Sequence, residues 1–406
     1  MKLLKRNDKA YLLIIDFLMS IAGKVKMMSI YLDHAATTPV HPKVKEAMLP
    51  FLDQAFGNPS SIHQYGREVR SALDQARDQI ALSLNADSSR IVFTSGGTEA
   101  DNLALFGVME SERKKGKNHL ITSKIEHHAV LDTCRYLERN GFEITYLPVD
   151  SKGLVDVEAL KKATKPTTAL ISIMYGNNEV GTIQPVREIG EWARERGIFF
   201  HTDAVQAFGM EKIDVKQLPV DLVTISSHKI NGPKGAGALY FAPEVPLIPR
   251  SFGGAQERRR RAGTENVLGI VGFGKAAEIA SQNRREHRAK MEVLRQAFLE
   301  ELENSGINHV VNGDPDRRLP HIANVSFPGT DSETLLMNFD LEGIACASGS
   351  ACTSGTLEVS HVLKAMNLPE EVTRSAIRFS FGWENTEEEA RKAAQITASI
   401  VKRLTS

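Results

Sequence analysis

The sequence has little cysteine and no net charge, and each shortage excludes a class of protein. Its 406 residues contain three cysteines, Cys134, Cys346 and Cys352, and no CxxC motif. This excludes a disulfide framework and fits a cytoplasmic protein whose thiols stay reduced. Fifty basic and fifty acidic residues cancel, so net charge gives no reason to expect nucleic acid or an anionic membrane as a partner. No apolar run reaches the roughly 18 residues that a bilayer-spanning helix needs.

Residues 1–27 share no pattern with the rest of the chain. They begin with basic residues and continue into a mostly apolar stretch, as a signal peptide does, but Asp16 interrupts that stretch. Met28 then directly precedes a clean strand-like run, 29–32. We expect residues 1–27 to be a dispensable extension or an over-long gene start. A short amphipathic accessory helix and an export signal are the alternatives.

Short apolar runs alternate with helical stretches between about residues 90 and 242. The runs are β-branched and nearly continuous in apolar character, as buried parallel strands are. The alternation predicts an α/β fold with a mostly parallel doubly wound sheet, in which ligands bind at the carboxyl ends of the strands. A long charged helix over 283–302 then leads into a C-terminal α+β segment. The expected strands are 90–93, 119–122, 143–146, 169–173, 198–200, 222–225 and 239–241, and the expected helices between them include 129–139 and 186–196.

Lys229 is the most informative residue. It follows a strand-like run, directly after Ser226 and His228, while Asp203 and Gln206 follow the preceding run. Pyridoxal 5'-phosphate (PLP) needs a lysine that forms an imine and an acid that faces the pyridinium nitrogen. A lone lysine is usually just solvated. The five residues together, each at the end of a strand, favour a PLP site.

A phosphate cradle is predicted at residues 94–102. Gly97 and Thr98 lie in a stretch of glycines and hydroxyls that follows a strand and opens a helix, where backbone amides bind phosphate. The stretch has neither the lysine of a P-loop nor a GxGxxG pattern. Ordinary helix capping by Thr98 explains it about equally well. Its importance is that it offers a monophosphate site in the same chain as Lys229.

Two further strand ends carry polar side chains. His127 can stack on a cofactor ring and shuttle protons, although a pair of histidines at a helix start explains it too, and no spaced ligand set supports a metal. Asn178 can bind a ring hydroxyl or a substrate carboxylate, or simply form an Asn-rich turn.

Arg378 is strand-borne and suits a carboxylate, with a surface salt bridge as the alternative. A run of arginines, 258–261, precedes Thr264. Because Glu257 and Glu265 flank it, a solvated loop or a phosphate-facing subunit contact is favoured over RNA binding.

Cys352 lies in a segment of small residues, 346–356. A thiol there can reach a substrate and then a partner, provided that it ionises. Cys134 lies within an amphipathic helical pattern and is expected to pack in the core.

The whole set resembles the cysteine desulfurases of the NifS/IscS family, class V of the fold-type I PLP enzymes. The motifs YLDHAATTP at 31–39 and FGNPSS at 56–61 extend this resemblance to almost everything after residue 28. It implies a large PLP-binding domain over 44–280 and a small domain formed by 28–43 and 281–406. For the cofactor ring, it implies Lys229 as the Schiff-base lysine, His127 stacked on the ring, Asp203 on the pyridine nitrogen, and Gln206 near the ring oxygen with Asn178 nearby. For the cofactor phosphate, it implies contacts from Gly97, Thr98, Ser226 and His228, with Thr264 donated by the other subunit. Arg378 would bind the substrate carboxylate, and Cys352 would be the persulfide cysteine.

The resemblance implies a cytoplasmic homodimer that removes sulfur from L-cysteine, gives L-alanine, and passes a persulfide on Cys352 to an acceptor protein. The acceptor would be an iron–sulfur scaffold or a tRNA thiolase, and neither a membrane nor direct nucleic-acid binding is expected. Cys346 and His128 depart from the family pattern. Three other functions remain as alternatives. A PLP aminotransferase or kynureninase-like lyase would not need Cys352, whereas a selenocysteine lyase would share it. A non-enzymatic scaffold would not need Lys229, Asp203 and Arg378 together.

Overall fold

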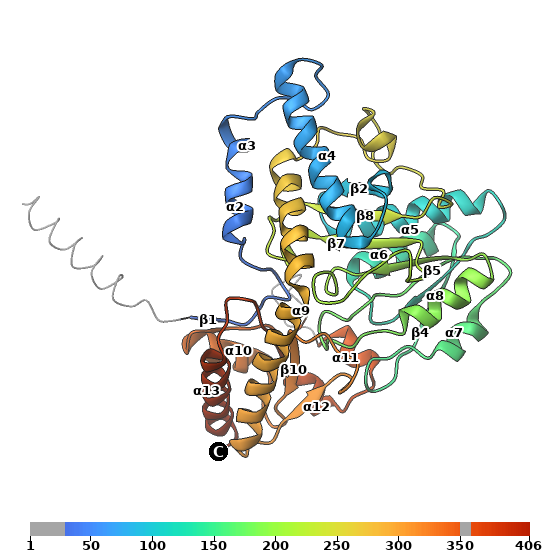
Figure 1. Cartoon of the computed structure of the whole chain (residues 1–406). Helices are drawn as coiled ribbons and strands as arrows, with labels where there is room; N and C mark the ends of the chain where they lie inside the picture. The colour runs from blue at the N-terminus through green and yellow to red at the C-terminus, as the bar shows by residue number, and fades with distance from the viewer. Residues whose placement is uncertain (1–28, 350–358) are drawn as a thin grey trace, which may run out of the picture.

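The computed structural model describes residues 29–349 and 359–406 and centres on a seven-stranded sheet (Figure 1). The expectations for residues 1–27 and for Cys352 lie outside the described residues. The strand order is β2-β8-β7-β6-β5-β3-β4, and all pairs are parallel except the two that β8 makes. The predicted α/β fold with a mostly parallel sheet is confirmed. The strands are β2 (Ile91–Thr94), β3 (His119–Ser123), β4 (Glu143–Leu147), β5 (Thr168–Ser172), β6 (Phe199–Asp203), β7 (Leu222–Ser226) and β8 (Gly237–Phe241).

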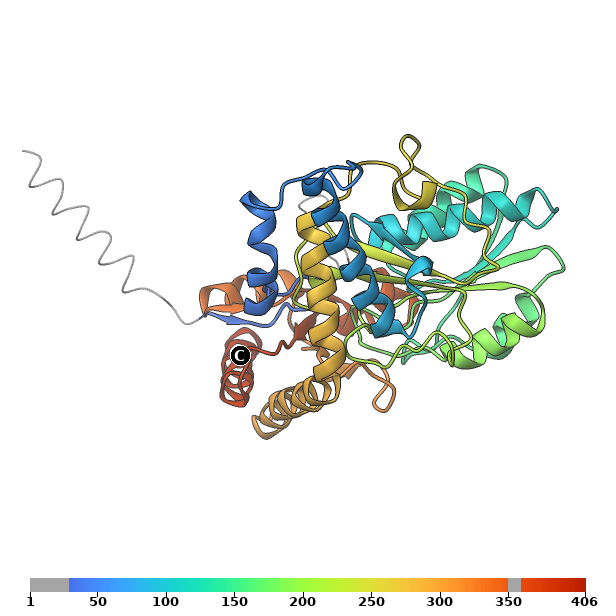
Figure 2. The same ribbon diagram turned by 45° about the horizontal axis from the view of Figure 1, so that its top comes forward.

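Helices cover both faces of this sheet (Figure 2). Consecutive strand residues point to opposite faces and join different apolar clusters. Leu170 packs in the cluster that contains residues of α5 (Gly97–Arg113) and α6 (His128–Arg139). Ile171 packs in the cluster that contains residues of α8 (Val186–Glu195), and α7 (Val157–Ala163) lies beside α8. Burial on both faces explains why the strands read as continuous apolar runs.

A third apolar cluster lies around the small sheets of the C-terminal segment. It contains Phe298, Phe379 and Phe381, all buried. The antiparallel order is β12-β10-β9, and β1 pairs in parallel with β11, more than 300 residues away in the chain. The elements are β1 (Ile30–Tyr31), β9 (Val310–Asn312), β10 (Ile322–Ser326), α10 (Ser332–Leu341), β11 (Ile344–Ala345), α11 (His361–Ala365), α12 (Glu370–Arg374), β12 (Ala376–Ser380) and α13 (Glu387–Thr405).

The long helix α9 (Val267–Asn304) starts 16 residues earlier than predicted. Its first half is rich in glycine and carries few charges, so it lacks the amphipathic pattern that marked 283–302. The glycines have a packing reason: a Cβ at Gly272 would lie 2.7 Å from Met48 Sδ, and one at Gly274 would lie 2.7 Å from the Cα atom of Ala76. They allow α2 (Pro42–Met48) and α4 (Gln64–Leu84) to approach closely, with α3 (Pro50–Asp53) alongside.

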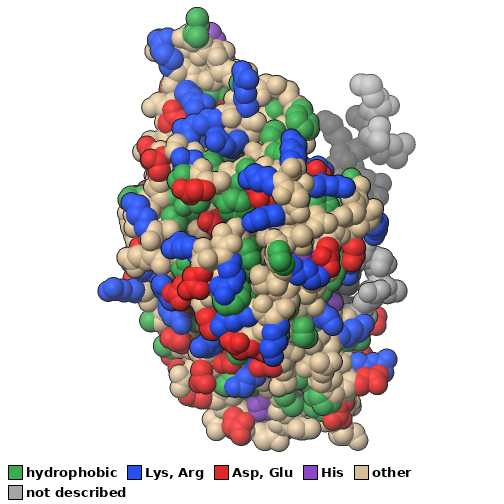
Figure 3. Space-filling view, turned by 90° about the vertical axis from the view of Figure 1, so that its right-hand side faces the viewer, with side chains coloured by type: hydrophobic (Ala, Val, Ile, Leu, Met, Phe, Trp, Pro, Cys, Tyr) green, Lys and Arg blue, Asp and Glu red, His purple; other side chains and the backbone are tan. Residues whose placement is uncertain are grey.

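Helix α9 also contacts α13, so it runs from the α4 side to the C-terminal segment (Figure 1). It passes through the predicted boundary at 280/281, and the division into two domains stays a prediction. Within 29–349 and 359–406, no helix is long and apolar enough to cross a bilayer. Basic and acidic side chains are interspersed on the face that Figure 3 displays.

Candidate active site

A cavity of about 680 Å³ opens where the parallel strands end. Its walls come from the ends of β6 and β7, the starts of α5 and α6, and the turn after β5. Ten of the residues singled out from the sequence line it together. They are Gly97, Thr98, His127, Asn178, Asp203, Gln206, Ser226, His228, Lys229 and Arg378.

Lys229 ends the short 3-10 turn η2 (Ser227–Lys229) that follows β7. Its Nζ donates to the carbonyl oxygens of Ala35 and Ala36 at 2.5 and 2.8 Å. Burial, reinforced by the Arg378 cation, lowers the pKa of Lys229 to about 8. A substantial fraction of the amine is therefore neutral near physiological pH, as an imine-forming lysine requires. The two carbonyls were not identified from the sequence, because backbone groups leave no trace in residue types.

Asp203 is buried at the end of β6, and its Oδ1 accepts the Val205 amide at 2.9 Å. Burial raises the pKa of Asp203, while the nearby Lys229 cation opposes that rise. A second acid, Asp101, is fully buried beside it, and burial with the Asp203 charge raises the pKa of Asp101 further. A cationic ring nitrogen is the group that would keep a carboxylate ionised in this position.

Gln206 connects Lys229 to a residue that the sequence did not single out. Its Nε2 donates to the Ala35 carbonyl at 2.9 Å, and its Oε1 lies 3.3 Å from His321 Nε2. His321 is buried, and burial lowers its pKa to about 3, so the ring is neutral. Its Nε2 must carry the proton, because the Gln206 oxygen can only accept. His321 follows Pro320 in a stretch without a motif, which is why the sequence gave no reason to select it.

Gly97 and Thr98 form the start of α5, a 17-residue helix whose first amides face the cavity. A Cβ at Gly97 would lie 2.9 Å from Val205 Cγ2, so the backbone is open only because the residue is glycine. Ser226 Oγ is buried and has no partner within the described part of the chain. His228 lies next to it, with Nδ1 3.3 Å from Thr37 Oγ1. Free amides and a spare hydroxyl at a helix start suit a phosphate group.

His127 is the N-cap of α6, and its Nδ1 accepts the Ala129 amide at 3.1 Å. Burial among protein atoms and the Lys229 cation lower the pKa of His127 to about 4. The ring is therefore neutral, with its proton on Nε2. His127 lines the cavity together with His128 and His361, and the rings of the latter two lie 4.7 Å apart. His361 was not predicted.

Arg378 lies on β12 and is buried. Its Nη2 donates to Asp33 Oδ1 at 2.8 Å and its Nη1 to the Asn178 carbonyl at 3.0 Å. Its Nε is buried without a partner among the residues that the structure describes. An ion pair is therefore present, as in the alternative of a salt bridge, but its arginine is buried and does not lie at the surface. The position remains suited to a small carboxylate.

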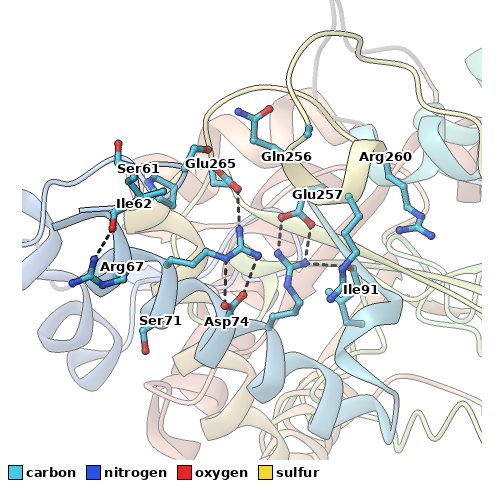
Figure 4. A pocket seen from close by; sticks show the side chains of 16 residues that line it. Ser61, Ile62, Arg67, Ser71, Asp74, Ile91, Gln256, Glu257, Arg260 and Glu265 are labelled. Carbon is cyan, nitrogen blue, oxygen red and sulfur yellow. Dashed lines mark hydrogen bonds and ion pairs between the residues drawn. The ribbon is translucent and has the colours of Figure 1, made fainter. Parts of the chain in front are cut away.

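Thr264 does not line this cavity. It is exposed beside Glu265, which lines a second hollow of about 780 Å³ between α4 and the turn η3 (Gln256–Arg259) (Figure 4). There Arg77 donates two hydrogen bonds to Glu257, at 2.7 and 2.6 Å. Within one subunit, Thr264 and Lys229 are thus in different places, and the role of Thr264 stays a prediction.

Two of the cysteines are described. Cys134 lies in the apolar cluster beside α5, and Cys346 packs against the C-terminal cluster. Burial raises the pKa of both thiols, so neither is a ready nucleophile.

The residues of the cavity fit PLP. The unpartnered Ser226 hydroxyl and the Gly97 amides would hold its phosphate, the buried Asp203 its ring nitrogen, and Lys229 its aldehyde carbon. Three partly unsatisfied buried groups, Ser226 Oγ, Asp101 Oδ1 and Arg378 Nε, converge on this volume, whereas native structures leave few such groups without a reason. Fold and site together define a PLP-dependent enzyme.

Comparisons with known proteins specify the family. Residues 30–392 match the family described as Aminotransferase class-V. A protein of Dictyoglomus turgidum named cysteine desulfurase IscS is 49% identical over 92% of this chain and 95% of its own length. The solved structure of a NifS-like protein superposes with a TM-score of 0.87 at 38% identity, covering 92% of this chain and all of that one. Another, titled SspA in complex with cysteine, gives 0.77 at 38% identity and covers 87% and 99%.

The chain belongs to the aminotransferase class-V family of PLP enzymes. Within it, the chain is a member of the NifS/IscS group of cysteine desulfurases, as the resemblance implied.

Proposed function

We propose that this protein removes the sulfur of L-cysteine, releases L-alanine, and holds the sulfur as a persulfide on Cys352. One observation carries the proposal: Lys229 and Asp203, the pair that PLP requires, share a single cavity with Arg378, a buried cation suited to the carboxylate of an amino acid. PLP bound there would supply an electron sink for the bonds at the substrate's Cα.

The side chains divide the remaining work. Arg378 binds the substrate carboxylate and so orients the amino acid in the cavity. Lys229 moves the α-proton, because a pKa of about 8 lets it exist in both protonation states near neutral pH. His127, neutral with its proton on Nε2, offers a hydrogen bond to the reacting groups at the cavity wall.

In the sulfur transfer, the Cys352 thiolate attacks the sulfur of the substrate. An S–S bond forms, the Cβ–S bond breaks, and the carbon skeleton takes up protons and leaves as alanine. The balance is one thiol and one cysteine in, one persulfide and one alanine out. No external oxidant is needed, since the substrate carbon is reduced as the sulfur is oxidised.

We also propose a homodimer in which Thr264 completes the phosphate site of the partner. Two observations support this: Thr264 is exposed and lies away from the cavity of its own subunit, and large apolar side chains are exposed at and near the hollow that its neighbour Glu265 lines. Ile62 lines the hollow of Figure 4, and the stacked pair Phe56 and Tyr65 is exposed in the adjacent part of the chain. Sedimentation should show a dimer, and a fully active monomer would contradict the proposal.

The persulfide would pass to an acceptor protein, an iron–sulfur scaffold or a tRNA thiolase, in the cytoplasm. The relatives named cysteine desulfurase support a sulfur acceptor in general. Capture of bound partners, followed by an assay of sulfur transfer to each, identifies which acceptor is used.

Cys352→Ser tests the function. The variant should keep the visible band of the bound cofactor and its spectral response to cysteine, yet lose alanine and sulfide production. Cys346→Ser serves as the matched control, because its partly buried thiol packs against the C-terminal apolar cluster, and it should cost far less. Full desulfuration of cysteine by Cys352→Ser would favour a PLP lyase or aminotransferase that needs no thiol.

A further inference from the structure

Glu179 contacts residues on both sides of segment 350–358. Gly349 precedes that segment, and an added Cβ there would lie 2.5 Å from Glu179 Oε2. Ser360 lies just after it, and its hydroxyl donates to the same Oε2 at 2.5 Å. Glu179 Oε2 therefore lies close to both Gly349 and Ser360, which are eleven residues apart in the chain.

The backbone around Glu179 is held firmly. The amides of Glu179 and Val180 both donate to Asn177 Oδ1 at 2.9 Å. The Glu179 carbonyl accepts Asn324 Nδ2 at 3.2 Å, which ties this turn to β10. The Glu179 carboxylate thus projects from a fixed point of the cavity wall.

Ser360 is held just as firmly. It is the N-cap of α11, and its Oγ accepts the amides of Val362 and Leu363 at 3.1 and 3.2 Å. Since that oxygen already accepts two hydrogen bonds, its proton is free to point at Glu179. The arrangement joins the start of α11 to the turn after β5.

The preceding side is also tied to the site. The backbones of Ala347 and Arg378 exchange two hydrogen bonds, at 3.2 and 2.6 Å. Arg378 in turn donates to the carbonyl of Asn178, the neighbour of Glu179. The stretch before the segment therefore approaches the cavity beside the residue that we expect to bind the substrate carboxylate.

Packing alone does not explain a glutamate here. Glu179 is 2% exposed, and it forms no ion pair with a lysine or arginine of the described residues. Burial raises its pKa, so the carboxyl carries an energetic cost that an apolar side chain would avoid. A buried polar group is retained at such a cost where its hydrogen bond specifies a geometry.

We propose that Glu179 is a positioning residue for the sulfur-transfer step: its carboxylate accepts a hydrogen bond from Ser360 and lies against Gly349, so it fixes the described residues on either side of the segment that bears Cys352. The inference rests on the proposed function, in which Cys352 receives the sulfur. It assigns to Glu179 the placement of that thiol and no part in binding PLP or cysteine.

Glu179→Ala and Glu179→Gln in the full-length holoenzyme test this. Glu179→Ala should lower kcat for alanine formation by about tenfold or more, since small displacements of reacting groups cost this much, with KM for cysteine changed by less than about twofold. Glu179→Gln keeps an acceptor for Ser360 and should recover most of the rate. Ser360→Ala should resemble Glu179→Ala. Asp156→Ala, which removes the N-cap of α7, is the matched control and should leave kcat unchanged.

Two further measurements separate positioning from general damage. The cofactor band and its response to cysteine should be the same in all variants. The alkylation rate of Cys352 in the resting enzyme, followed by mass spectrometry with the buried Cys134 as internal reference, should change in Glu179→Ala and return towards wild type in Glu179→Gln.

Equal kcat and equal Cys352 alkylation in Glu179→Ala and wild type would overturn the inference, provided that Cys352→Ser is inactive. Loss of the cofactor band in Glu179→Ala would also overturn it, since Glu179 would then support the PLP site itself. Full desulfuration by Cys352→Ser would instead refute the proposed function.

Discussion

Arg378 Nη2 lies 2.8 Å from Asp33 Oδ1, so the guanidinium on β12 is paired with a carboxylate from the segment just after β1. The two residues are 345 positions apart in the chain. The pair holds the guanidinium at the cavity and neutralises its charge while no substrate carboxylate is present. Binding of cysteine would add a second carboxylate to the same cation, on the side of its unpartnered Nε.

Arg378→Lys should raise KM for cysteine by about tenfold or more, because an ammonium cannot reproduce the planar fork of a guanidinium. The cofactor band should persist, since Lys229 and Asp203 remain. Steady-state kinetics of alanine release measure this. Arg374→Lys changes an exposed arginine paired with Glu370 and should leave KM unchanged. An unaltered KM in Arg378→Lys would remove Arg378 from the substrate site.

Covalent attachment of PLP to the cofactor-free protein should accelerate as the pH rises through about 8. Only the neutral amine of Lys229 is a nucleophile, and its pKa is lowered to that value mainly by burial. Growth of the visible band after mixing, followed as a function of pH, gives the midpoint. Asp203→Asn removes a negative charge that raises the pKa of Lys229, so its midpoint should move to lower pH. A midpoint near the ordinary lysine value of 10.5 would contradict the assignment.

Ser226→Ala should weaken PLP binding by about tenfold, the cost of one hydrogen bond to a charged group. It should not destabilise the cofactor-free protein, because Ser226 Oγ has no partner among the residues of the described structure. Ser172→Ala is the matched control: its hydroxyl lies 2.9 Å from His201 Nδ1, so it should lower stability instead. Equilibrium binding of PLP and thermal unfolding of both variants separate the two effects. Equal losses of PLP affinity and of stability in the two variants would contradict the assignment of Ser226 to the phosphate site.

The cofactor-free protein should lose stability as the pH falls from about 6.5 towards 4. Burial lowers the pKa of His34 to about 4 and those of His201 and His321 to about 3, from 6.5. The unfolded chain therefore binds more protons than the folded one in this range. Stability should fall by up to about 1.4 kcal/mol per pH unit for each histidine.

His321→Gln should reduce that slope by the share of one proton, since glutamine keeps a donor for Gln206 and cannot titrate. Denaturant unfolding between pH 4 and 7 measures the slopes of both proteins. Identical slopes would show that His321 does not take up a proton on unfolding.

The sequence predicted much of the fold because buried parallel strands have a local signature. The seven strands of the central sheet lie within three residues of their predicted ends. The exception was α9, whose first half reads as irregular because Gly272 and Gly274 serve contacts with α2 and α4, which lie far away in the chain. Glycine lowers the helix propensity of this stretch, but packing against α2 and α4 outweighs that cost.

The candidate site was predictable to the extent that its residues follow strands. Asp203 and Ser226 each end a buried strand and Lys229 follows one, and parallel strands bring their carboxyl ends together. Glu179 and His321 have no such marker. Glu179 matters because the fold brings Ser360 to it, and His321 matters because the fold brings Gln206 to it. No local sequence pattern contains either contact.

By itself the sequence determined the class of fold, ten of the residues that line the cofactor cavity, and the expectation of PLP chemistry, because periodicity and strand-end motifs are local properties of the chain. Only the tertiary structure decided which groups surround each of them. The pairing of Arg378 with Asp33, the carbonyls of Ala35 and Ala36 at Lys229, and the lowered pKa of that lysine all arise from segments almost 200 or more residues apart. Hydrogen bonding and desolvation act through space, so they exist only after such segments have packed together.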